Sequence, residues 1–330
     1  MPNRGRAPST LSVVVALGTV YVVWGSTYLA IAYVVETLPP LLAASARFLV
    51  AGAALMAFVA AQHAWRRARG GTESLAAPRL VEWRTALIVG ALLLLGGNGL
   101  VSLAEQRIPS GIAAVMIATV PIWMSLFEAV LTRRAPSGLA VGGIAVGLIG
   151  AVILLLPTDG LRSLDPIGVG MVAFSAMAWA IGSLYARRGP LPRNALLGTG
   201  MEQFAGGVAL GVAGLAIGEP ASMDLAHVSA ASLIGLGYLV VFGSLAAFTA
   251  YVWLLNHVPV TTVATYAYVN PVVAVALGVF FRHEPLTPRT LLAAALIIGA
   301  VVAMVTGRPR DVEDAGAAPD AHLEHADDVA

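Results

Sequence analysis

Long apolar runs fill the chain from residue 11 to residue 306, and only short polar connections separate them. An α-helix needs about 20 apolar residues to cross the hydrocarbon core of a bilayer. The pattern therefore predicts an all-α integral membrane protein. Ten membrane-spanning helices are expected, at 11–34, 41–61, 85–104, 110–131, 138–156, 166–186, 195–217, 231–254, 260–281 and 289–306.

The apolar runs form a repeat. Trp24 recurs 155 positions later as Trp179, and the segment from Pro109 to Pro121 recurs 150 positions later as Pro259 to Pro271. Each half holds five predicted helices, an odd number, so the second half must lie upside down relative to the first. We expect two inverted five-helix repeats, an arrangement found in small-solute carriers. They span 11–156 and 166–306, and an outer loop at 157–165 connects them.

Composition supports a membrane location. Hydrophobic residues make up 58% of the chain and charged residues 11%, against roughly 45–50% and about 25% in soluble domains. There is no cysteine, which excludes disulfides and thiolate chemistry. Residues 307–330 carry two arginines against seven acidic residues, and this composition predicts a disordered tail.

Arginine placement predicts the orientation, because positively charged loops stay in the cytoplasm. With both termini cytoplasmic, including residues 1–10, fourteen arginines lie on the inner side and four on the outer side. Arg47 lies inside a predicted helix and is counted on neither side. The chain is expected to cross its membrane several times, and the family resemblance given below implies that this membrane is a bacterial inner membrane.

Two prolines fall near the middle of predicted helices, Pro121 in the fourth and Pro271 in the ninth. Proline removes a backbone hydrogen bond and breaks or kinks a helix. Carbonyl groups freed within a bilayer must face protein or a wet cavity. We therefore expect a pair of broken helices around a cavity at the membrane midplane, although a kink that only improves packing remains the alternative.

Polar and aromatic residues cluster at the same depth and are the expected lining of this cavity. Amide and hydroxyl groups orient a polar ligand, and aromatic rings offer stacking faces and cation–π attraction. The predicted lining residues are Trp24, Tyr28, Asn98, Met116, Thr119, Trp179, Ser183, Ser244, Phe248, Tyr266 and Asn270.

Three intramembrane charges need separate interpretations. Arg47 must find a partner or reach the interface, and the expected difference in depth argues against a direct pair with Glu202. Glu128 lies near the cytoplasmic end of its helix, close to Arg133 and Arg134. Either glutamate could bind a coupling proton, because a low dielectric favours the neutral carboxyl form. Gradient-driven facilitation or exchange fits the sequence equally well.

With these residues the chain resembles the EamA-domain family of the drug/metabolite transporter superfamily, over residues 11–306. The resemblance is carried by Trp24-Gly25-Ser26-Thr27-Tyr28, by Pro39-Pro40 with Arg47-Phe48, by Asn98-Gly99, by Pro109 to Pro121 and by Tyr268-Val269-Asn270-Pro271. It implies a ten-helix carrier that exports small polar or amphipathic solutes, among them amino acids and drug-like compounds, by alternating access. It also implies a folding or gating role for Arg47.

Two other classes of protein remain as alternatives. A membrane-embedded enzyme would need catalytic groups within hydrogen-bond reach of one another, and the four histidines before the tail all lie near helix ends or in loops. A non-transporting scaffold would leave the two prolines and their polar neighbours without a role. The expected partners are a small-molecule substrate and the lipid bilayer, with no nucleic acid, metal or cofactor. Glycine pairs such as Gly207 and Gly211 allow either packing within one chain or a homodimer.

Overall fold

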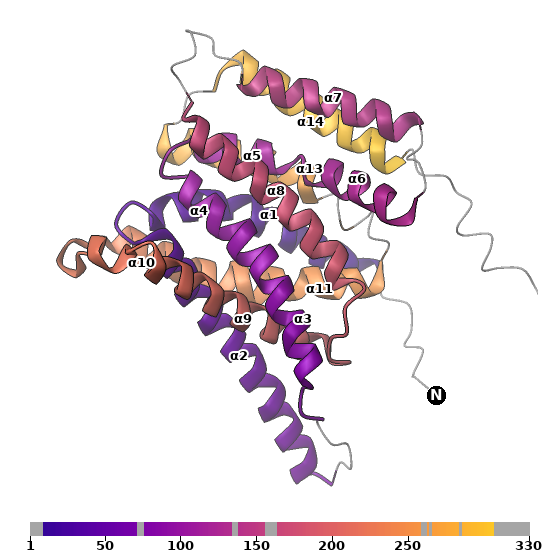
Figure 1. The fold of residues 1–330 in the computed structure, drawn as a ribbon, viewed down its shortest axis with the longest axis vertical. Helices are drawn as coiled ribbons and strands as arrows, with labels where there is room; N and C mark the ends of the chain where they lie inside the picture. Colours follow the sequence, from indigo (N-terminus) through magenta and orange to yellow (C-terminus); the bar gives the residue numbers. More distant parts are fainter. Residues whose placement is uncertain are drawn as a thin grey trace, which may run out of the picture.

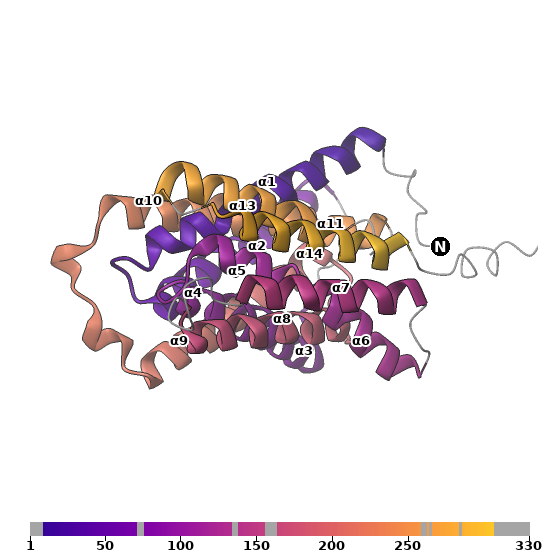
Figure 2. The ribbon, with the colours of Figure 1, turned by 90° about the horizontal axis from the view of Figure 1, so that it is seen from above.

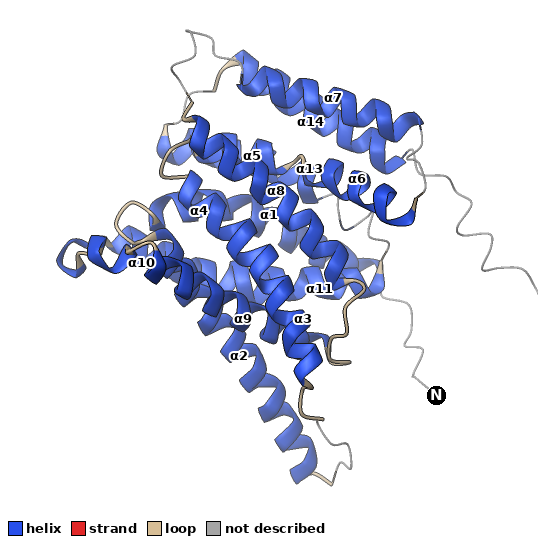
Figure 3. Ribbon diagram, viewed as in Figure 1, coloured by secondary structure: helices blue, strands red, loops and turns tan. Residues whose placement is uncertain are grey.

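A computed structural model describes residues 9–70, 76–133, 138–155, 164–258, 263, 266–283 and 286–306. The predicted disorder of the tail at 307–330 lies outside these ranges. Regular structure in the described residues is entirely helical, without strands (Figure 3). Within these ranges, six helical stretches are long and apolar enough to cross a bilayer, namely Thr10–Val34, Pro40–Ala68, Leu80–Ala104, Ser110–Leu131, Pro166–Ala186 and Ala230–Leu254.

The first half of the chain forms seven helices and one π-helical segment, η1. Their bounds are α1 Thr10–Val34, α2 Pro40–Ala68, α3 Leu80–Gly90, η1 Ala91–Gly99, α4 Leu100–Ala104, α5 Ser110–Ile117, α6 Val120–Thr132 and α7 Gly138–Leu155. The segments α3, η1 and α4 follow one another directly. They constitute the third predicted membrane helix.

The second half begins at α8 and contains a second π-helical segment, η4. Its elements are α8 Pro166–Ala186, α9 Ala195–Ala216, the short 3-10 turns η2 Glu219–Ser222 and η3 Leu225–His227, α10 Ala230–Tyr238, η4 Leu239–Ala247, α11 Phe248–His257, α13 Tyr266–Arg282 and α14 Pro288–Thr306. The segments α10, η4 and α11 together constitute the eighth predicted membrane helix.

Local sequence explains where several helices begin. Pro40 and Pro166 are the first residues of α2 and α8, where the missing N–H of proline costs nothing. Asp165 caps α8 by accepting from the N–H groups of Ile167 and Gly168. Asn194 caps α9 in the same way.

The helix of the second predicted span continues beyond its expected end. α2 reaches Ala68, whereas the apolar run ends near residue 61. Arginines in this last turn interact favourably with the negative end of the helix dipole. The end of α2 projects from the rest of the bundle (Figure 1).

Glycines allow α9 to pack backbone against backbone with two neighbours. A Cβ added at Gly52 of α2 would lie 2.5 Å from the backbone nitrogen of Phe204, and one at Gly90 of α3 would lie 2.5 Å from the backbone oxygen of Glu202. Further along the same seam, Gly207 lies against Leu49. Residue numbers rise on α2 as they fall on α9, so these two helices are antiparallel. The small residues pack helices within one chain.

The last helix of each half forms a separate layer. α7 and α14 lie side by side along one edge of the bundle (Figures 1 and 2). A Cβ added at Gly147 would lie 3.2 Å from Ala300, and one at Gly150 would lie 2.9 Å from Ile297. These contacts make α7 and α14 antiparallel as well. Their inner faces join the buried cluster that also contains Ile122.

The two prolines differ in what the backbone does around them. The α-helix is interrupted at Ala118 and Thr119, and Pro121 is the second residue of the new helix α6. Pro271 was expected to mark a second break, but α13 runs without interruption from Tyr266 to Arg282, so that expectation is wrong. A proline removes only one hydrogen bond, and neighbouring helices can hold the remaining turns in place.

Candidate functional site

A cavity of about 70 Å³ lies at the centre of the bundle. This volume has room for several water molecules. Both halves of the chain contribute to its wall. The lining residues are Trp24, Thr27, Tyr28, Ile31, Arg47, Phe48, Gly97, Asn98, Val101, Ile117, Val120, Ser175, Trp179, Phe248, Tyr266 and Asn270.

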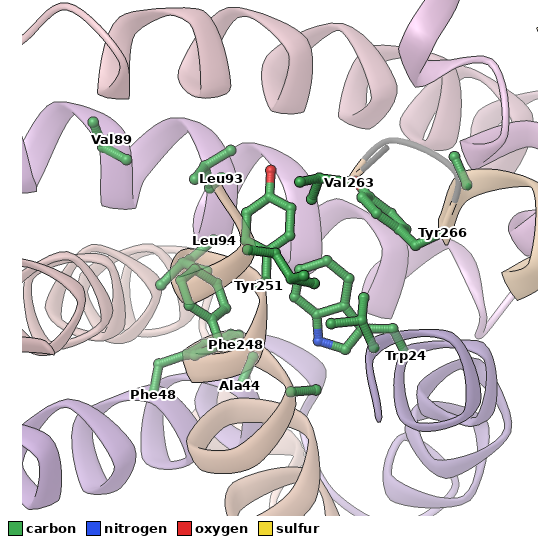
Figure 4. Packing of buried hydrophobic residues seen from close by; sticks show 14 of the residues in the cluster. Trp24, Ala44, Phe48, Val89, Leu93, Leu94, Phe248, Tyr251, Val263 and Tyr266 are labelled. Carbon is green, nitrogen blue, oxygen red and sulfur yellow. The ribbon is translucent and has the colours of Figure 1, made fainter. Parts of the chain in front are cut away.

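Aromatic rings pack around Trp24 at this cavity, and Figure 4 shows four of them, Trp24, Phe248, Tyr251 and Tyr266. The ring centroid of Trp24 lies 6.0 Å from those of Trp179 and Phe248, 4.8 Å from that of Tyr251 and 5.1 Å from that of Tyr266. Three of these contacts are edge-to-face, the arrangement that aromatic quadrupoles favour. We call these five residues the aromatic cluster.

A second cavity, of about 420 Å³, lies beyond the aromatic cluster on the predicted cytoplasmic side. Phe248 lines both cavities, and Tyr251 lines the second one. The aromatic cluster therefore stands between two hollows of different size. Arg187 and Arg193, from the connection between α8 and α9, form part of the outer wall of the second cavity.

The two π-helical segments supply backbone carbonyl groups near the centre. A π-helix appears mostly as a short widening of an α-helix, often at a functional site. The indole Nε1 of Trp24 donates to the carbonyl oxygen of Gly243 in η4 at 3.2 Å. The hydroxyl of Ser175 donates to the carbonyl oxygen of Gly97 in η1 at 2.9 Å. Helices α1 and α8 are thus each anchored to the π-segment of the opposite half.

Asn270 anchors α13 to α1. With its amide oriented as its neighbours require, its nitrogen donates to the carbonyl oxygens of Tyr21 at 3.2 Å and Tyr266 at 3.1 Å. Asn270 is only 4% exposed, and it lines the central cavity. A buried amide needs such partners, because an unpaired polar group at membrane depth costs several kcal/mol, roughly.

Arg47 is buried at the wall of the central cavity, with 5% of its surface exposed. Its Nε donates to the hydroxyl of Ser244 at 2.8 Å, and its Cζ lies 4.5 Å from the ring centroid of Phe48. A Cβ at Gly243 would lie 2.9 Å from the Nη2 of Arg47, so a glycine there leaves room for the guanidinium. The expectation that Arg47 and Glu202 do not pair agrees with this geometry.

The eleven predicted lining residues occupy three kinds of position. Seven line the central cavity, namely Trp24, Tyr28, Asn98, Trp179, Phe248, Tyr266 and Asn270. Ser183 lines the second cavity instead. Met116, Thr119 and Ser244 lie outside the lining of both cavities: Met116 is part of a buried apolar cluster, Thr119 donates to the carbonyl oxygen of Met116, and Ser244 supports Arg47.

The two glutamates that were considered together are in different surroundings. Glu202 is 7% exposed and lines the second cavity. The Oε1 of Glu128 lies 3.9 Å from the Nη1 of Arg187, which makes a long ion pair. The side chain of Glu128 is 32% exposed and that of Arg187 is 44% exposed. The structure thus gives Glu128 a partner at the C-cap of α8, Arg187, which is distant from it in sequence.

Sequence reasoning missed several cavity residues. Thr27 and Ser175 lie one turn from the tryptophans of their helices, a spacing that could have identified them. Tyr251 follows Phe248 by three residues and belongs to the same helix face. No sequence signal pointed to Gly97, which faces Trp179 because η1 is π-helical.

Polar contacts tie the helix ends on the predicted outer side. The carboxylate of Glu219 accepts from the backbone N–H groups of Leu41 and Leu42, at 2.9 Å and 2.8 Å, and thereby caps α2 from the opposite half. The Nη1 of Arg107 donates to Asp165 at 2.7 Å. This bond, and then the N–H of Ile167, lower the pKa of the Asp165 carboxyl below its ordinary value.

The described residues contain no group of three or more histidine, aspartate or glutamate side chains placed to hold a metal ion. The site consists of a small cavity, an aromatic cluster and a buried cation within an apolar helical bundle. Together with the apolar helices long enough to cross a bilayer, this arrangement is that of a multi-pass membrane protein.

The chain belongs to the EamA-like transporter family, whose profile matches residues 11–156 and again residues 166–306. An uncharacterized inner membrane transporter of Escherichia coli K12, YedA, is 39% identical over 297 residues, which cover 89% of this chain and 90% of that protein. Protein PecM of Dickeya dadantii is 26% identical and covers 85% of this chain and 88% of its own length.

A solved structure described as a crystal structure of protein has the same fold. Its TM-score is 0.60 at 20% identity, and the match covers 89% of this chain and 96% of that one. The two family matches coincide with the two halves read from the repeat in the sequence. The chain is therefore a multi-pass membrane protein of a transporter family.

Proposed function

We propose that the chain is a secondary transporter that exports small polar or amphipathic metabolites, such as amino acids or drug-like compounds, across a bacterial inner membrane by alternating access. The central cavity is the observation that carries this proposal. It lies between the two halves of the chain, and amide, hydroxyl and aromatic groups from both halves line it. Such a mixture of apolar wall and few polar groups is typical of small-molecule sites.

The directions of the helices support two inverted five-helix repeats. α2 and α9 are the second helices of the two halves, α7 and α14 are the fifth, and each pair is antiparallel. The π-segments η1 and η4 occupy corresponding helices and receive side-chain bonds from α8 and α1 respectively. In an inverted repeat the two halves can rock against each other around a fixed site.

The arrangement of the two cavities supports alternating access. The larger cavity reaches the connection between α8 and α9, and the aromatic cluster separates it from the smaller central cavity. Movement of these rings would join the two spaces on one side of the membrane. Glu202 lines the larger cavity and is the better placed of the two glutamates for a coupling proton.

Cysteine accessibility tests the wet cavity, and the chain has no native cysteine to interfere. Cysteine at Asn98, which lines the cavity, should react with a small charged methanethiosulfonate reagent. Cysteine at Ala113, which is 0% exposed within an apolar cluster, is the matched control and should stay unlabelled. Equal protection of both positions would contradict a hydrated cavity.

Flux measurements separate a transporter from an enzyme or a scaffold. Proteoliposomes containing the full chain are loaded with a mixture of amino acids and amphipathic drugs, and release is followed by mass spectrometry. A transporter releases a solute with its mass unchanged, an enzyme changes the mass, and a scaffold matches protein-free liposomes. Either of the last two results would overturn the proposal.

A further inference from the structure

The electrostatic imbalance of the central cavity indicates what kind of solute it takes. Among the described residues that line it, Arg47 is the one ionisable cation, and none is an aspartate or a glutamate. Within the described residues, no ion pair includes Arg47. The cavity therefore presents a positive charge that its own wall does not neutralise.

The known contacts of Arg47 satisfy only part of its guanidinium. A guanidinium carries five N–H donors, and the structure gives Arg47 one hydrogen bond, from Nε to Ser244 at 2.8 Å. The ring of Phe48 adds an attraction at 4.5 Å. Neither neighbour carries a negative charge. Since an isolated charge at membrane depth is costly, binding of an anion beside Arg47 would be favourable.

A second donor in the same wall has only a poorly aligned acceptor. The indole Nε1 of Trp179 is buried beside the hydroxyl of Tyr266 and forms no well-aligned hydrogen bond among the described residues. Trp179 lines the cavity together with Arg47 and Asn98. Trp24 differs, because its indole nitrogen already donates to Gly243. Arg47 and Trp179 thus both direct N–H groups to this wall, which favours a ligand that brings an acceptor.

The rest of the wall suits an organic body. Trp24, Phe248 and Tyr266 present rings to the cavity, and Ile31 and Val101 add aliphatic surface. Rings in this arrangement can stack on or pack against an apolar group. The polar end and the apolar part of a solute would thus meet different sides of one small space.

We propose that Arg47 is the residue that binds the anionic group of the transported solute, which is a small organic anion with a carboxylate or an equivalent group on an apolar body. This inference rests on the proposed transport function and specifies its substrate class. It assigns Arg47 to ligand contact, in place of the folding or gating role that the family resemblance implied. Ser244 acts as a positioning residue, because it holds Nε and leaves the other guanidinium nitrogens for the ligand.

Probes that share one apolar body and carry an anionic, a neutral or a cationic end group test this proposal. Phenylacetate, phenylacetamide and 2-phenylethylammonium share one ring, as isovalerate, isovaleramide and isopentylammonium share one branched chain. Binding to the full chain in nanodiscs is measured as a rise in the thermal midpoint with probe concentration, which gives an apparent affinity. We expect the two anions to bind best. In Arg47→Gln their affinity should fall about tenfold or more, the effect of losing a charge-assisted hydrogen bond.

Arg107→Gln is the matched control, since it removes an arginine whose partner is Asp165 and which lies outside the cavity lining. The affinity for the anions should change less than about twofold in this variant, as for other exposed ion pairs. Ser244→Ala should weaken anion binding less than Arg47→Gln does. Circular dichroism and elution profiles show whether each variant folds, and if Arg47→Gln does not, the charge preference of the unmodified protein decides.

Three results would overturn the inference. They differ in whether the proposed transport function is also overturned. Preference for the amides or amines removes the anion assignment and leaves the transport function intact. Anion binding that Arg47→Gln retains, with normal folding, removes the role of Arg47. Absence of binding by all six probes, together with an unreactive cysteine at Asn98, removes the cavity and the proposed function with it.

Discussion

Trp24 is the residue whose replacement tests the aromatic cluster most directly. Its indole contributes two separable terms: one hydrogen bond to Gly243 at 3.2 Å, and ring contacts with four aromatic neighbours. Trp24→Phe removes the hydrogen bond and keeps a ring. A single bond of this kind contributes about 1 kcal/mol within a membrane protein, so this variant should lose about that much.

Trp24→Ala removes both terms. The side chain is 8% exposed, so its loss leaves a cavity that the surrounding helices close only in part. Truncation of a buried tryptophan to alanine costs about 3–5 kcal/mol. The ring pairs alone account for about 0.5–1.5 kcal/mol each. We therefore expect the alanine variant to lose roughly three times as much unfolding free energy as the phenylalanine variant.

Chemical denaturation in detergent, followed by circular dichroism, measures both losses. Trp65→Phe is the control, because Trp65 is 55% exposed and its ring has a cation–π contact with Arg69. Its unfolding free energy should change by less than about 0.5 kcal/mol. If Trp24→Phe and Trp24→Ala lost equal amounts, or if Trp24→Ala lost less than about 1 kcal/mol, the aromatic cluster would not hold these helices together in the way described.

Four further variants test other parts of the structure. Gly206→Leu should lower the unfolding free energy by about 2 kcal/mol or more, because its Cβ would lie 2.6 Å from a neighbouring side chain and 2.8 Å from a backbone oxygen. Gly170→Leu is the control and should leave the unfolding free energy unchanged, because a Cβ there meets nothing within 4 Å. Equal losses in the two variants would contradict the close packing at Gly206. Glu219→Gln should cost about 1–2 kcal/mol in the same assay by weakening the cap of α2, and an unchanged stability would show that the cap is unimportant. Asp165→Asn should reduce the loss of unfolding free energy at acidic pH. A carboxyl whose pKa is lowered in the folded state stabilises the fold above its ordinary pKa of 3.8, and this contribution is lost as the pH falls through the folded-state pKa. A denaturation series from pH 7 to about pH 3 in which both proteins behaved alike would refute this ion-pair effect. Glu202→Gln should make flux in proteoliposomes independent of an imposed pH gradient, and a retained response would exclude Glu202 as the coupling group.

The sequence was sufficient to predict most of the helices. Apolar length alone predicts the spans, since each must be about 20 residues long. The predicted residues that line the central cavity, such as Trp24, Trp179 and Asn270, share one property: each is too polar or too amphipathic to face lipid at that depth. Placement of this kind depends on depth along a helix, which the sequence contains.

The features that the sequence did not predict depend on geometry within or between helices. A π-helical segment is wider than an α-helix, and η1 begins in the apolar run Ala91–Leu95, where periodicity carries no signal. Glu219 caps a helix that begins 179 positions earlier, at Pro40, and only folding brings the two together. The break expected at Pro271 is absent because a proline removes one backbone hydrogen bond without forcing the helix to end. The hydrogen bond from Asn270 to Tyr21 ties this part of α13 to α1.

The π-segments connect the fold to the proposed transport. Each lies in the middle of a membrane helix and offers a carbonyl oxygen to a side chain of the opposite half, at Gly97 and at Gly243. The η4 segment also contains Ser244, whose hydroxyl accepts from Arg47 and whose carbonyl oxygen accepts from the Nε2 of Gln203 at 3.3 Å. One irregular segment thus contacts α1, α2 and α9 at the depth of the cavity. A shift in η4 would therefore move the aromatic cluster and the anion-binding arginine together, which would link binding of a solute to the rearrangement that releases it.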